Sequence, residues 1–125
     1  MATVYFETNG GLLKEPLIIK AVEVKITDSK LCFYTMDDLD KLVYHGYCEL
    51  IFEKAIFRQK ANNNDVLVFD FKSDIAYYDF YLKDEPQYFP FNSLKYTLSE
   101  NSFLATYTTN NDISRPINII IKWQS

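Results

Sequence analysis

The chain has few of the residues that build most catalytic and metal sites. Its 125 residues include one histidine, two cysteines and three glycines. Zinc sites take three or four Cys or His ligands at short spacing, and Cys32, His45 and Cys48 match no such spacing. Phosphate-binding loops need several glycines at fixed intervals, whereas Gly10-Gly11 is a lone pair. We therefore expect no metal, no cofactor and no catalytic residue.

Two further absences bear on the cell compartment. No apolar run approaches the roughly 20 residues that span a bilayer, and the start lacks the basic and apolar segments of a signal peptide. Cys32 and Cys48 each fall inside a predicted strand and form no CxxC motif, so we expect two reduced thiols. These features favour the cytoplasm of the producing cell, or of the host cell if the protein is viral.

The charge is mildly acidic, with 17 Asp and Glu against 13 Lys and Arg and a net charge of −4. A negative protein repels nucleic acid and anionic membranes, and it attracts basic surfaces. We therefore expect no nucleic-acid partner and no membrane partner. The expected partner is another protein with a basic surface.

Aromatic residues are abundant instead: ten Tyr, ten Phe and one Trp. They lie mostly in short alternating runs separated by turn residues, which is typical of β-strands. The length fits a single β-rich domain over residues 1–125. We predict an all-β, mainly antiparallel fold, a β-sandwich or flattened barrel of about eight to nine strands. One short helix is predicted near residues 36–43.

Turn residues define the predicted hairpins. Asp28-Ser29 joins strands 17–27 and 30–35, with Ile26 opposite Leu31 and Glu23 opposite Tyr34. Other predicted strands cover residues 3–7 at an edge, 47–58 as one long strand that is either central or bent by a bulge near Lys54-Ala55, 94–98, 103–108 and 117–123. The segment 84–92 contains two prolines and is predicted as a loop or a ragged edge.

The hairpin over residues 66–82 has the clearest alternation. A turn at Ser73-Asp74 places Phe69 opposite Tyr78, with both side chains buried. The other face then pairs Asp70 with Tyr77, Val68 with Asp79, and Val66 with Tyr81. Asp70 and Asp79 lie on one predicted face. A pair of carboxylates ~5–10 Å apart is what glycoside hydrolases use for catalysis.

This second face is the first candidate binding surface. Asp70, Tyr77, Asp79 and Tyr81 combine tyrosines with carboxylates, as protein-binding patches do. In a two-layer fold the same tyrosines can instead be covered by a second sheet. A second candidate is the aromatic group Tyr88, Phe89 and Phe91, which either projects as an anchor or plugs one end of the fold.

The sequence therefore favours a small, acidic, non-enzymatic protein-binding module. Inhibitors, immunity-type proteins and phage or viral accessory proteins belong to this physical class, a grouping by size and charge. The alternative is a β-barrel that holds a small apolar ligand in an aromatic-lined cavity. An enzyme ranks third, because no titratable groups converge in the sequence.

Overall fold

The computed structural model describes residues 1–36, 44–61, 63–109 and 114–125. These residues form eleven strands, more than the eight or nine predicted, and every pair of neighbouring strands is antiparallel. The all-β class is confirmed, and the described residues contain no helix. Of the predicted helix, Met36 lies in a strand and residues 37–43 fall outside the described ones.

The strands follow the chain in short, regular steps. They are β1 (Thr3–Gly10), β2 (Leu17–Ile26), β3 (Lys30–Met36), β4 (Tyr44–Ile51), β5 (Ile56–Ala61), β6 (Val66–Asp70), β7 (Ile75–Asp79), β8 (Gln87–Tyr88), β9 (Phe91–Leu98), β10 (Ser102–Thr109) and β11 (Ile117–Gln124). They form one sheet in the order β8-β7-β6-β5-β4-β3-β2-β1-β11-β10-β9. The first strand, predicted at an edge, therefore lies between β2 and β11.

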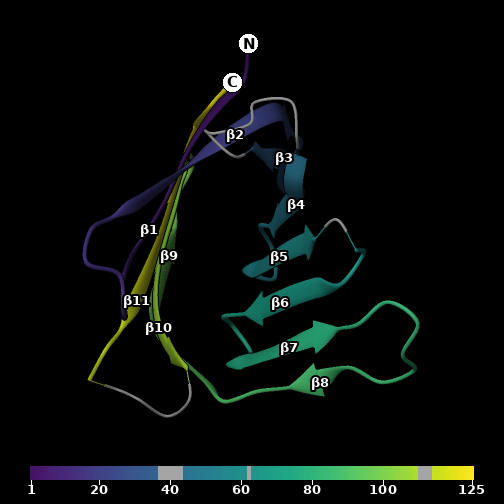
Figure 1. The fold of residues 1–125 in the computed structure, drawn as a ribbon. Helices are drawn as coiled ribbons and strands as arrows, with labels where there is room; N and C mark the ends of the chain where they lie inside the picture. The colour runs from purple at the N-terminus through teal and green to yellow at the C-terminus, as the bar shows by residue number, and fades with distance from the viewer. Residues whose placement is uncertain (37–43, 62, 110–113) are drawn as a thin grey trace.

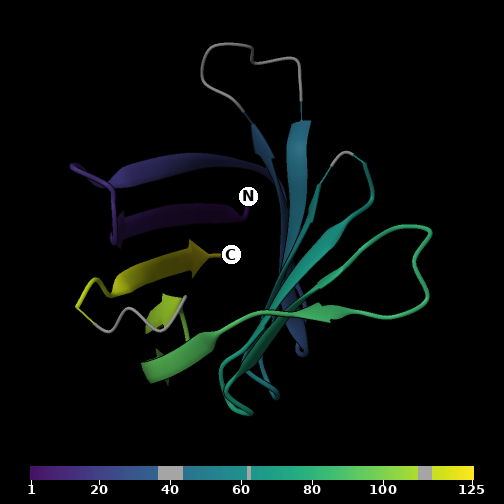
Figure 2. The same ribbon diagram turned by 60° about the horizontal axis from the view of Figure 1, so that its bottom comes forward.

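The sheet folds over into two layers whose strands run across one another (Figures 1 and 2). The first layer holds β1, β9, β10 and β11, and the second holds β3 to β8. Strand β2 belongs to both: residues 17–19 pair with β1, and residues 20–26 pair with β3. The two layers also meet where the amide of Ser93 on β9 donates a 2.6 Å hydrogen bond to Asp74 Oδ1 in the turn between β6 and β7. The result is a flattened, incompletely closed barrel.

A bulge in β2 corrects the predicted register of the first hairpin. Ile26 lies opposite Leu31 as predicted, but Val22, not Glu23, lies opposite Tyr34. Glu23 has a positive φ of 52° and is the extra residue on its strand. A bulge of this kind bends a strand and increases its twist, and this one lies within the part of β2 that already pairs with β3.

The predicted long strand 47–58 is two strands, β4 and β5, joined by a turn. The sequence does not reveal this turn, because two of its residues, Phe52 and Ala55, are apolar and packed like strand residues. Phe52 stacks on Trp123 of the first layer, with ring centroids 5.5 Å apart, and Ala55 is buried. Ala55 also has a positive φ of 49°, a conformation that glycine usually supplies.

The second clear hairpin has the predicted faces but a register shifted by two residues. Phe69 lies opposite Ala76, and Leu67 lies opposite Tyr78. The turn takes four residues, 71–74, because the Phe71 amide donates to the Ala55 carbonyl and Asp70 Oδ1 accepts from the Ser73 amide. A two-residue shift keeps every side chain on its face. Tyr78, predicted to be buried, is 39% exposed.

Phenylalanine rings fill the space between the layers. Phe6 of β1 contacts Phe33 of β3 and Phe57 of β5 edge-on, at centroid distances of 5.7 and 5.6 Å. Near the meeting edges, Phe69 lies 5.5 Å from Phe91 and 5.1 Å from Tyr107. Edge-to-face and offset ring pairs add to the stabilisation that burial itself provides.

We expect Phe69→Ala to lower the free energy of unfolding by about 3–5 kcal/mol, as large-to-small changes do in a packed core. Urea unfolding followed by circular dichroism measures this loss. The control is Leu12→Ala, whose side chain is exposed and whose loss should stay under about 0.5 kcal/mol. A loss below about 1 kcal/mol for Phe69→Ala would contradict its place in the core.

Candidate interaction surface

The outer face of the second layer carries one continuous row of side chains from β3 to β8. The registers place these six residues side by side in the order Cys32, Glu49, Arg58, Val68, Tyr77 and Tyr88. Cys32 and Val68 are buried although no strand of the described residues covers this face. The row is thus charged in its middle and aromatic at the β8 edge.

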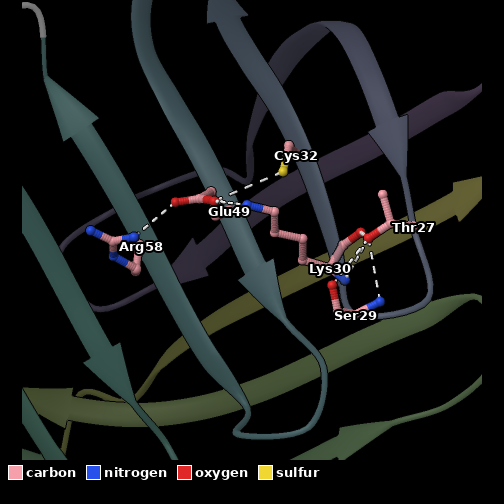
Figure 3. A network of polar contacts seen from close by, with 6 residues as sticks. All are labelled: Thr27, Ser29, Lys30, Cys32, Glu49 and Arg58. Carbon is pink, nitrogen blue, oxygen red and sulfur yellow. Dashed lines mark hydrogen bonds and ion pairs between the residues drawn. The ribbon is translucent and has the colours of Figure 1, made fainter.

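The charged middle is a closed ion-pair network (Figure 3). Glu49 accepts from Lys30 Nζ at 2.8 Å through one carboxylate oxygen and from Arg58 Nη1 at 2.9 Å through the other. The hydrogen bond with Glu49 raises the pKa of Lys30 above its usual range. Because Glu49 is already bound on both oxygens, this part of the row holds the sheet face together and offers no free carboxylate.

The aromatic end of the row brings two of the predicted residues together. Tyr77 of β7 and Tyr88 of β8 lie directly opposite each other, with ring centroids 5.2 Å apart. Tyr88 is 60% exposed. Asp79 is exposed on the same strand and face as Tyr77, and Asp70 is half-buried on β6. These four residues, Asp70, Tyr77, Asp79 and Tyr88, are called the Tyr77–Tyr88 patch below.

The other three predicted residues lie elsewhere. Tyr81 is exposed beyond the end of β7, where its amide donates a 2.9 Å hydrogen bond to Asp65 Oδ1. Phe91 is buried, and Phe89 packs against the core with its ring 6.2 Å from that of Phe69. Both phenylalanines pack into the interior, so the candidate surface consists of the four patch residues.

The two patch aspartates do not form a glycoside-hydrolase pair. Asp70 lies opposite Ile75, and Asp79 lies opposite Val66, at the two ends of the β6–β7 hairpin. Four residue steps along a strand separate their backbones by about 13 Å. Because acid and base carboxylates in that chemistry lie ~5–10 Å apart, this pair fits a charged surface better than a catalytic one.

Sequence analysis missed a hollow on the inner face of the second layer, at its end away from the phenylalanine core. Its volume is about 390 Å³, and Leu67, Tyr78 and Phe80 line one side. The Tyr78 and Phe80 rings stack at 5.4 Å. Gly46 lies on the floor, where a Cβ would come within 3.0 Å of the Lys60 carbonyl. The missing side chain there helps to leave the space open.

Cys48 lies on the wall of this hollow and is a free thiol, as is Cys32. Both free thiols match the sequence prediction. Burial raises the pKa of Cys48 to about 12. Its thiol therefore stays protonated and unreactive at neutral pH. A 4.0 Å contact from Gln59 Nε2 to its sulfur is too weak to reverse this effect.

The chain matches no protein-family model, no curated protein and no solved structure. Over the described ranges, no helix is long and apolar enough to cross a membrane. In the same ranges, no three His, Cys, Asp or Glu side chains gather as a metal site. The surface geometry is therefore the basis on which a function is proposed.

The Cys48 thiol should couple stability to alkaline pH. Its pKa is raised from the ordinary 9.0 to about 12 in the fold, so the unfolded chain loses this proton first. The free energy of unfolding should therefore fall as the pH rises above about 9, by up to ~1.4 kcal/mol per pH unit. Cys48→Ala should remove this part of the slope in urea unfolding between about pH 8 and pH 10. Identical slopes for both proteins would contradict the raised pKa.

Proposed function

We propose that the protein is a non-enzymatic binding module that engages a basic protein surface through the Tyr77–Tyr88 patch. One observation carries this proposal: the Tyr77 and Tyr88 rings lie side by side at the edge of the sheet, and Tyr88 is largely exposed. Tyrosine offers a large contact area with few rotatable bonds, which is why it is enriched in protein interfaces.

The backbone around Tyr88 is well suited to hold an anchor in place. Strand β8 has two residues and lies between Pro86 and Pro90. Proline fixes its own φ, and short, proline-flanked edge strands resist adding a further strand. Recognition at this edge would therefore depend on side chains. Because the backbone that carries them is already restricted, binding would cost little further conformational entropy.

Charge gives the patch its preference for a basic partner. Asp79 is exposed beside Tyr77, and Asp84 and Glu85 are exposed in the connection from β7 to β8. Carboxylates at the rim of an interface mainly accelerate association with a basic surface. The net charge of −4 acts in the same direction.

We expect Asp79→Lys to slow association with the partner and Tyr88→Ala to accelerate dissociation, because rim charges act on the on-rate and anchors on the off-rate. The partner is first captured from a lysate of the source cells, and surface plasmon resonance then measures both rates. The matched control is Glu100→Lys, an equal charge change at an exposed residue of the distant β9–β10 turn. Wild-type binding by folded forms of both patch variants would refute this surface.

The hollow favours a second candidate function, the binding of a small apolar ligand. The space between the layers is filled by phenylalanines, so this ligand would lie against Leu67, Tyr78 and Phe80 instead. Apolar walls with a few polar groups are typical of such sites. Gln59 and Asn63 supply amides in the wall, and Lys60 and Asp65 supply charged groups.

The fluorescent probe anilinonaphthalene sulfonate tests this second candidate. We expect one saturable site that Ala61→Trp abolishes, because residue 61 lines the hollow and a larger side chain would fill it. The control Leu12→Trp adds the same ring at an exposed residue on the other layer. Equal probe binding by both variants would place the probe outside the hollow.

A further inference from the structure

A glutamine lies among apolar side chains on the inner face of the second layer. The registers place Cys48, Gln59, Leu67 and Tyr78 side by side on four neighbouring strands, and all four line the hollow. Gln59 lies two residues after the buried Phe57 on β5, so its side chain faces the same way. The Gln59 side chain is therefore part of the wall, between the Cys48 thiol and Leu67.

The hydrogen-bonding capacity of this amide is almost unused. A side-chain amide has two N–H donors and an oxygen that accepts two hydrogen bonds. Among the described residues, the partner of the Gln59 side chain is the Cys48 sulfur, 4.0 Å from Nε2, and sulfur is a weak acceptor. Gln59 is half-buried, so water can reach its amide in the free protein. A ligand that displaces this water must replace its hydrogen bonds.

The charged groups of the hollow favour a neutral ligand. Lys60 and Asp65 both line it and carry opposite charges, so neither sign of ligand charge gains a net advantage. Asp65 is already engaged, because Oδ1 accepts from the Tyr81 amide at 2.9 Å and Oδ2 accepts from Asn63 Nδ2 at 3.0 Å. Burial raises the pKa of Cys48 to about 12 and keeps its thiol neutral. Taking a charged ligand group out of water without a dedicated partner would be costly.

We propose that the hollow binds a small aromatic molecule bearing a primary amide or a lactam, with its ring against Tyr78 and Phe80 and its amide paired with Gln59. Such an amide carries a donor and an acceptor side by side, as Gln59 does, so the two can exchange two hydrogen bonds. The Tyr78 and Phe80 rings, stacked at 5.4 Å, offer an aromatic wall. A volume of about 390 Å³ is at the small end for ligand sites. This inference rests on the second candidate function and names the chemical class of its ligand.

Benzamide and acetophenone are a matched pair of probes for this test. Both have a phenyl ring and a carbonyl group, and an amino group in benzamide replaces the methyl group of acetophenone. Only benzamide can donate a hydrogen bond as well as accept one. Titration of isotope-labelled protein, followed by NMR, gives both dissociation constants and shows whether the residues of the hollow respond. We expect benzamide to bind more tightly, although acetophenone is the more apolar molecule.

Two variants of Gln59 test the pairing. Gln59→Leu removes the amide, so the ratio of the acetophenone to the benzamide dissociation constant should fall about 5- to 100-fold, the range that two neutral hydrogen bonds give. Gln59→Glu should instead favour benzamidinium, a cation with the shape of benzamide that donates from both nitrogens. The control Gln124→Leu makes the same change at an exposed residue of β11, outside the hollow, and should leave the ratio unchanged.

The outcomes separate this inference from the candidate function on which it rests. A ratio that Gln59→Leu leaves unchanged would overturn the inference, while the binding of small apolar ligands would stand. The same holds if neither probe binds although anilinonaphthalene sulfonate still occupies the hollow. Failure of all three probes would refute the candidate function itself. If circular dichroism shows that Gln59→Leu does not fold, Gln59→Glu decides alone, and an unchanged preference for benzamide over benzamidinium would overturn the pairing.

Discussion

The contact on which the rest of the structure depends is the meeting of the two layers around Phe6. Its ring comes from β1 and touches Phe33 and Phe57 of the other layer edge-on. Both partner rings have no exposed surface. The described residues hold no helix to cover the sheet, and both described cysteines are free. A single sheet can then bury its apolar face only by folding onto itself, and β2 links the layers because residues 17–19 pair with β1 and residues 20–26 pair with β3.

This constraint separates the two aromatic residue types. The inner faces take the phenylalanines, which carry no polar atom to satisfy. Tyrosines go mostly to outer faces and edges, where the hydroxyl reaches water; Tyr5 and Tyr88 are exposed there, and Tyr78, on the inner face beside the hollow, is still 39% exposed. Tyr107 is the exception: it is buried, and desolvation raises its pKa to about 12. The surface therefore acquires tyrosine patches as a consequence of filling the core with phenylalanine.

In the hairpin over residues 66–82, alternation was enough to predict which residues share a face, whereas in β2 the bulge at Glu23 changed the faces. Phe69 is in the core, and Tyr77 shares the outer face with Asp79, because a two-residue error in register changes no face. Turn lengths were not predictable in the same way. Phe71 and Phe52 have the composition of strand residues, yet both lie in turns whose backbone groups or rings are held by distant elements. Such tertiary contacts leave no local signal in the sequence.

The same reasoning explains what was missed around the candidate surface. Tyr88 lies next to Tyr77 only because two residues of a proline-flanked segment pair with β7, and no periodicity marks so short a strand. Strand β9 is an edge because it does not pair with β8, which would have closed the barrel. Both edges carry hydrogen-bonding capacity that the fold itself does not use. Prolines limit that capacity at β8 and leave side chains to act, whereas at β9 a bulge at Leu94 interrupts the edge. An incompletely closed sheet thus has two chemically different edges, and each is modified in its own way against the addition of a further strand.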